Sequence, residues 1–157
     1  MRISQVLLSG LAGAGLLTAT HETVRRTVPK APRMDRLGME ALRKVIAKVD
    51  GKQPSAEKLF LYTMAGDVIA NALFYSLGGV NSRNVVWRSM VLGLAAGVGA
   101  VLLPEPMGLD PKPGARTVPT QLMTVALYTL GGLTTGLVLK LFAKRQKPQA
   151  PVQTLVF

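Results

Sequence analysis

Apolar and polar residues follow one another along the chain in long blocks. Three apolar blocks contain no charged residue: 3–20, 89–104 and 117–139. A fourth block, 59–82, contains a single charge, Asp67. A helix needs about 17–25 mostly apolar residues to cross the hydrocarbon core of a membrane. The pattern therefore predicts several membrane-spanning helices.

The block at 89–104 is short, but residues 84–88 extend it. Trp87 suits the membrane interface, and Arg88 can reach the headgroups with its long side chain. A soluble all-α protein with buried helices is the alternative, but it would need more polar surface than the other residues provide. We expect one domain over 1–157, an all-α integral membrane protein with four transmembrane helices at about 3–20, 59–82, 85–104 and 117–141.

The first apolar block follows Arg2 and in this respect resembles a signal peptide. Before Thr20 the sequence reads Leu17-Thr18-Ala19, so Leu17 stands where cleavage needs a small residue. We therefore expect the first helix to stay uncleaved.

An amphipathic helix is predicted at 33–49, between the first two spans. Its apolar residues recur at steps of three and four: Met34, Leu37, Leu42, Val45, Ile46 and Val49. Its other face is basic: Arg36, Arg43, Lys44 and Lys48. Such a helix either lies flat on an anionic membrane leaflet or caps the end of the bundle.

Local signals mark the limits of this amphipathic helix. Asp35 is expected to cap its start, and Asp50-Gly51 is expected to end it. Glu40 and Lys44 are spaced to form an ion pair along the helix.

Three segments of the first half recur, in the same order, in the second half. The matched pairs are 10–22 with 93–105, 26–29 with 116–119, and 61–66 with 127–132. The pairs have different offsets, so the first half needs an insertion, which the amphipathic helix would be. The recurrence predicts two repeated helical hairpins, although Gly- and Leu-rich membrane helices also look alike by composition alone.

Glycines are spaced four apart on two of the predicted spans. Gly93 and Gly97 form one pair, and Gly132 and Gly136 form the other. Small residues at this spacing let membrane helices approach closely. We expect these glycines to pack helices within the chain, with a homodimer contact as the alternative.

Asp67 belongs to a polar stripe on the second span. Thr63, Asp67 and Asn71 are four residues apart and therefore share one helix face. A comparable stripe on the fourth span contains Thr124, Tyr128 and Thr135. We expect hydrogen bonds between the two stripes that fix helix orientation. The alternative is a proton- or cation-binding site of a small transporter or channel, because intramembrane acids often mark such pathways.

Catalytic and metal chemistry has little support in the sequence. The chain has no cysteine and one histidine, His21. His21-Glu22 lacks further metal ligands and a nucleophile, and Glu22 is better placed to pair with Arg25 or Arg26. We expect no catalytic residue, no metal and no cofactor. A membrane-embedded enzyme that uses His21 and Glu22 is the third functional candidate.

The composition and charge of the chain indicate which partners it binds. The chain is 48% hydrophobic and 17% charged, and it has a formal net charge of +11. The basic residues flank the spans and are not interleaved with aromatic residues as in nucleic-acid recognition elements. We expect an anionic lipid bilayer as partner and no nucleic acid. Headgroup contacts are expected from Arg25, Arg26, Arg43 and Lys44.

The distribution of Lys and Arg also predicts an orientation. The segments 21–58 and 105–116 carry twelve of them, and the side that holds the termini carries seven. The positive-inside rule then places 21–58 in the cytoplasm, with the protein in a bacterial cell membrane. The basic tail at 142–157 argues for the opposite orientation.

These features predict a structural, scaffold or accessory-subunit role that depends on helix packing and lipid contact. A homodimer or a larger membrane complex would fit this role. A transporter or channel that uses Asp67 is the alternative.

Overall fold

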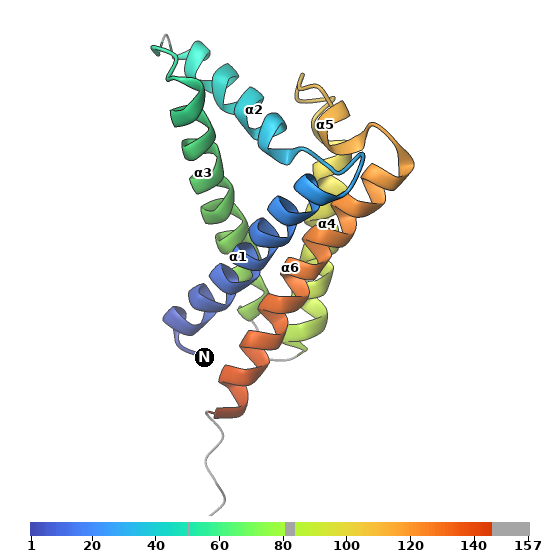
Figure 1. Ribbon diagram of the computed structural model, residues 1–157. Coiled ribbons are helices and arrows are strands. Elements are labelled where there is room, and N and C mark those ends of the chain that lie inside the picture. Colours follow the sequence, from blue (N-terminus) through green and yellow to red (C-terminus); the bar gives the residue numbers. More distant parts are fainter. Residues whose placement is uncertain (50, 81–83, 146–157) are drawn as a thin grey trace, which may run out of the picture.

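The computed structural model describes residues 1–49, 51–80 and 84–145 (Figure 1). Every regular element in these ranges is helical, as expected from the sequence. The α-helices are α1 (Ile3–Thr27), α2 (Met34–Lys48), α3 (Ala56–Ser76), α4 (Val85–Leu102), α5 (Lys112–Ala115) and α6 (Val118–Arg145). One 3₁₀ turn, η1, covers Leu77–Gly79.

Three described helices, α1, α4 and α6, are long and apolar enough to cross a membrane. α3 contains 21 residues and is also long enough, but its polar stripe of Thr63, Asp67 and Asn71 makes it less apolar. The expectation of a membrane protein with several spanning helices is thus supported by three of them. Residues 81–82 of the second predicted span lie outside the described residues.

The interior of the bundle contains nearly as many polar as apolar side chains among the described residues, and many large apolar side chains are exposed. The buried polar residues include Ser9, Thr63, Asn71, Ser76, Ser89, Thr120, Thr124 and Thr135. The strongly exposed apolar residues include Leu8, Leu61, Ile69, Leu73, Leu102 and Leu122. This arrangement is the reverse of that in soluble proteins. It suits a protein surrounded by lipid, where helices associate through close packing and internal hydrogen bonds.

The four long helices pack in the order α3, α1, α6 and α4. α1 lies between α3 and α6, and α4 runs along α6 (Figure 1). α3 has few contacts with α4 and α6. The bundle is therefore loosely closed between α3 and α4.

The contact between α4 and α6 is made by both glycine pairs. A Cβ atom on Gly132 would lie 2.8 Å from the Cα of Gly93. A Cβ atom on Gly136 would lie 2.7 Å from the Cα of Val86 on α4. These distances leave no room for a side chain, so the glycines permit two helix backbones to touch.

The predicted repeat is not seen in these contacts. Gly66 matches Gly132 in the sequence, yet a Cβ atom on Gly66 would have nothing within 4 Å. Gly10 matches Gly93, but Gly10 faces the backbone of Ala72 near the end of α3, whereas Gly93 faces the middle of α6. The two repeated hairpins stay a prediction.

The amphipathic helix predicted at 33–49 is α2. The expected ion pair is present, with Lys44 Nζ 2.9 Å from Glu40 Oε1. The expected cap is wrong, because the N-cap position is Arg33, whose side chain makes no capping hydrogen bond, and Asp35 lies within the first turn. At the other end Asp50 lies outside the described residues, as do residues 146–157 of the basic tail.

α2 crosses one end of the bundle, opposite the N-terminus and the end of α6 (Figure 1). Its N-terminal half is inserted there, with Leu37 buried, while Arg43 and Val45 in its second half are exposed. This placement corresponds to the expectation that the helix caps the bundle. Contact with a membrane leaflet stays a prediction.

The segment before α6 holds α2 in place. The backbone N–H of Arg33 donates to the carbonyl of Pro113 at 2.7 Å. Lys44 donates to the carbonyl of Gly108, a glycine whose positive φ of 74° few other residues adopt. The N–H of Asp110 donates to the Glu40 carboxylate at 3.2 Å. The short helix α5, unexpected in this Pro- and Gly-rich segment, completes the same end.

Candidate functional site

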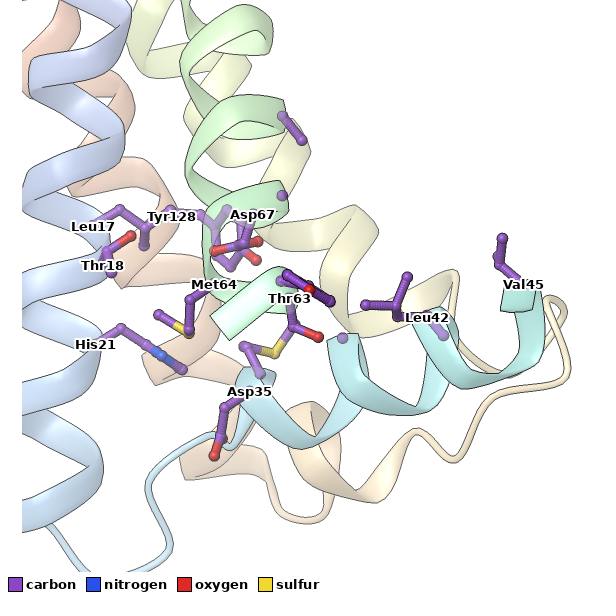
Figure 2. A pocket seen from close by; sticks show the side chains of 16 residues that line it. Leu17, Thr18, His21, Asp35, Leu42, Val45, Thr63, Met64, Asp67 and Tyr128 are labelled. Atoms are coloured by element: carbon purple, nitrogen blue, oxygen red, sulfur yellow. The ribbon is translucent and has the colours of Figure 1, made fainter. Parts of the chain in front are cut away.

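A cavity of about 330 Å³ lies under α2, between α1 and α3 (Figure 2). Tyr128 of α6 also borders it. Its polar lining consists of Thr18 and His21 from α1, Asp35 from α2, and Tyr62, Thr63 and Asp67 from α3. The cavity thus contains the acid singled out in the sequence, together with side chains from four helices.

Asp67 stands near the middle of α3 and is half-buried. The side-chain amide of Asn71 donates to Asp67 Oδ1 at 3.0 Å and to the Asp67 carbonyl at 2.9 Å. No ion pair to Asp67 occurs in the described part of the chain. One amide therefore stabilises this carboxylate, and no cation neutralises it.

Several polar atoms of the cavity have no hydrogen-bond partner. Among the described residues four buried side-chain atoms lack one, and three of these belong to the cavity: Thr18 Oγ1, His21 Nε2 and Thr63 Oγ1. Buried polar groups in native proteins nearly always have a partner, so each exception needs an explanation. Their concentration beside Asp67 fits a cavity that receives water, an ion or a polar ligand.

An ion-pair cluster forms the end of the cavity near α2. The Asp35 carboxylate is buried and accepts hydrogen bonds from Arg33 at 2.8 and 3.0 Å. Arg25 of α1 lies 3.9 Å from it. Burial by itself would raise the pKa of Asp35, but the Arg33 hydrogen bonds and both arginine charges outweigh it and lower this pKa. Asp35 is thus held as a carboxylate that joins α2 to α1.

Two buried tyrosines, of which Tyr128 lines the cavity, are joined by a hydrogen bond. The Tyr75 hydroxyl donates to the Tyr128 carbonyl at 2.8 Å, and both side chains are buried. This bond joins α3 to α6 one helical turn beyond Asn71. Along α3, Tyr75 lies beyond Asp67 toward the end of the bundle that holds the N-terminus.

A second hollow, a groove of about 590 Å³, lies between α3 and α4. It includes Asp67, Asn71 and Tyr128, and its other walls are mostly apolar, such as Ala96 and Leu103. The groove exists because α3 and α4 barely touch. Asp67 therefore borders two hollows.

The expected hydrogen bonds between the α3 and α6 stripes are not formed among the described residues. Thr124 donates to the carbonyl of Gly114, and Thr135 donates to that of Gly131 on its own helix. Tyr75 makes the cross-helix bond instead. Its position four residues after Asn71 continues the stripe, and this spacing could have identified it.

His21 and Glu22 are adjacent in the sequence but lie in different surroundings. Glu22 pairs with Arg25 and Arg26, as predicted. His21 belongs to the cavity, which the sequence analysis did not foresee. Within the described ranges no three His, Cys, Asp or Glu residues come close enough to hold a metal ion.

The residues expected at lipid headgroups differ in their surroundings. Arg25 and Arg26 are engaged by Glu22, and Lys44 by Glu40. Arg43 is exposed on α2. Lipid binding by these four residues stays a prediction.

Comparison of the chain with models of known protein families, with curated proteins and with solved structures finds no match.

Proposed function

We propose that the chain crosses the membrane four times, with α3 as a spanning helix in addition to α1, α4 and α6. A helix of 21 residues is about 31 Å long, close to the thickness of the hydrocarbon core. The outward residues Leu61, Ile69 and Leu73 of α3 are 62%, 60% and 56% exposed. Its polar stripe faces the cavities instead. This distribution suits lipid on one side of α3 and a polar interior on the other.

We further propose that the protein works at Asp67, as the proton- or cation-binding centre of a small transporter or channel. The observation that carries this proposal is that the unneutralised acid shares its cavity with three unpartnered polar atoms. A charged side chain at the centre of a membrane helix costs about 2.5–3.5 kcal/mol on insertion scales. Binding of a proton or a cation removes this charge.

The cavity provides the chemistry that such an occupant needs. The carboxylate of Asp67 and the hydroxyls of Thr18 and Thr63 are oxygen ligands, which suit hard cations. His21 Nε2 can accept or donate a proton, depending on the protonation state of the ring. In this proposal the hydrogen-bonded Tyr75 and Tyr128 separate the site from the far end of the bundle. Transport would require this tyrosine layer to open.

Ion flux in proteoliposomes tests the proposal. The full chain is reconstituted, and uptake of protons and of Na⁺ or K⁺ is followed with fluorescent indicators against protein-free vesicles. Asp67→Asn is expected to abolish the flux of the wild-type chain. Glu57→Gln, which removes an exposed acid from the same helix, is the matched control and should transport normally. Absence of wild-type flux, or undiminished flux with Asp67→Asn, contradicts the proposal.

An accessory-subunit role is a second candidate, and the groove between α3 and α4 favours it. Its apolar walls could receive a helix of a partner protein or of a second copy. Ala96→Trp would fill this groove, whereas Leu94→Trp would place the same side chain on an exposed side of α4. If a partner helix binds there, only Ala96→Trp releases it during gentle purification. Two further expectations are untested under either proposed function: the cytoplasmic placement of residues 21–58 and the repeat of two helical hairpins.

A further inference from the structure

A small basic pocket lies at the end of the bundle that carries α2 and α5. It has a volume of about 310 Å³ and is lined by Arg33, Arg36, Asp110, Lys112, Pro113 and Arg116. It lies apart from both hollows around Asp67, and it shares no lining residue with them. Four cationic side chains therefore border this pocket together with one acid.

The positive charge of the pocket is only partly compensated. Arg33 is paired with Asp35, which does not line the pocket. The side chains of Arg36, Lys112 and Arg116 have no hydrogen bond or ion pair within the part of the chain that the structure describes. Cations held this close repel one another, and an anion between them relieves that repulsion.

The fold ties together the backbone segments that carry these cations. Arg33 and Arg36 belong to the first turn of α2, and the N–H of Arg33 donates to the carbonyl of Pro113 at 2.7 Å. The N–H of Lys112 donates to Asp110 Oδ1 at 3.0 Å. Two segments far apart in the sequence are thus tied together around the pocket. A preorganised cluster of guanidinium groups matches the oxygen geometry of a phosphate group.

The pocket also lies next to the start of an apolar helix. Arg116 is followed at once by α6, whose first turns expose Val118 and Leu122, each by 65%. These apolar residues suit acyl chains, and the cations beyond them suit headgroups. We propose that this pocket binds a phosphate group, presented by an anionic phospholipid whose acyl chains lie along the start of α6. Basic pockets at the ends of membrane helices bind such lipids in this manner.

The two arginines that are free of an acidic partner provide the test. Arg36→Gln combined with Arg116→Gln removes two positive charges from the pocket. Lys48→Gln combined with Lys52→Gln removes two exposed charges that lie outside the pocket and is the matched control. The full chain is purified in mild detergent, and bound phosphatidylglycerol is measured by native mass spectrometry. The affinity of the pocket variant should fall by about tenfold or more, since charge-assisted contacts are strong, while the control stays within about twofold.

Parallel arms distinguish the sources of the phosphate. Phosphatidylcholine with the same acyl chains should bind weakly to all variants, and inorganic phosphate should not displace phosphatidylglycerol. Equal losses in the two double variants would mean that the attraction is diffuse, and displacement by inorganic phosphate would mean a soluble ligand. Either result overturns the proposal. Circular dichroism verifies that each variant is folded. Lys112→Gln, at an exposed position, repeats the affinity measurement with a single substitution in the pocket. Neither arm depends on Asp67.

Discussion

Alanine at Gly136 tests whether the backbones of α4 and α6 must touch. The added Cβ atom would lie 2.7 Å from the Cα and 3.1 Å from the carbonyl oxygen of Val86. Both neighbours are backbone atoms of a helix, so neither can rotate away. Ordinary Cβ contacts begin at 3.4 Å, so the helices must separate locally by about 0.7 Å.

The energetic cost follows from two opposing effects. Overpacking of this kind costs about 1–3 kcal/mol, and the better helix propensity of alanine returns up to about 1 kcal/mol. We expect Gly136→Ala to lower the free energy of unfolding by about 1–2 kcal/mol. Thermal unfolding in mild detergent, followed by the fluorescence of the single tryptophan, Trp87, measures the change.

Gly66→Ala is the matched control, because a Cβ atom there would have nothing within 4 Å. Gly66→Ala increases helix propensity and causes no steric clash, so its unfolding temperature should equal or exceed that of the wild type. If Gly136→Ala and Gly66→Ala unfold at the same temperature, the close contact between α4 and α6 does not determine stability, and the reasoning is wrong.

Two further changes are measured by the same unfolding assay. Asp35→Asn should destabilise the chain at neutral pH by about 1–3 kcal/mol, because buried hydrogen bonds to Arg33 lose their charged acceptor. The pKa of Asp35 is lowered in the folded chain from 3.8, so its contribution is complete well above pH 3.8. The difference from wild type should then vanish as the pH falls through the lowered value, and a difference that persists there would contradict this account. Tyr75→Phe should cost about 0.5–1.5 kcal/mol through the lost bond to the Tyr128 carbonyl, whereas Tyr62→Phe, at a side chain that is 54% exposed, should change nothing.

The helices could be predicted from the sequence because the hydrocarbon core excludes charge. The expected spans at 85–104 and 117–141 correspond to α4 and α6 within a few residues. α2 was equally predictable, because apolar residues recur along it at steps of three and four. This spacing indicates a helix with one buried side. The first turn of α3 begins earlier than expected, because Ser55 accepts a hydrogen bond from the N–H of Lys58 and starts the helix in a polar segment.

The arrangement of the helices was harder to predict. Facing stripes on α3 and α6 were expected from the spacing of polar residues. In the structure α1 packs against both helices, and α3 and α6 have few contacts with each other. Which helices pack together depends on which glycines contact which helix backbones. Glycines that have the same spacing on several helices do not specify this. Asp35 illustrates the same limit, since its role follows from Arg33 and Arg25, and Arg25 belongs to another helix.

The candidate site was predicted in part. Asp67 and Thr63 were identified by their shared face, and this stripe does border the cavity. Thr18 and His21 share a face of α1 at a spacing of three residues, but only the packing of α1 against α3 places them beside Asp67. Residues on separate helices become one site through tertiary contacts that a single sequence does not show.

The order of packing has a consequence for synthesis at the ribosome. If α3 spans the membrane as proposed, its polar stripe makes it the least favourable of the long helices to leave in lipid alone. Its main partners, α1 and α2, precede it in the chain. Both are therefore already made when α3 emerges from the translocation machinery, and α1 can shield the polar face of α3 at once. α4 enters next, and α6 arrives last to join it to α1, so that α3 and α6 each find their principal partner already made.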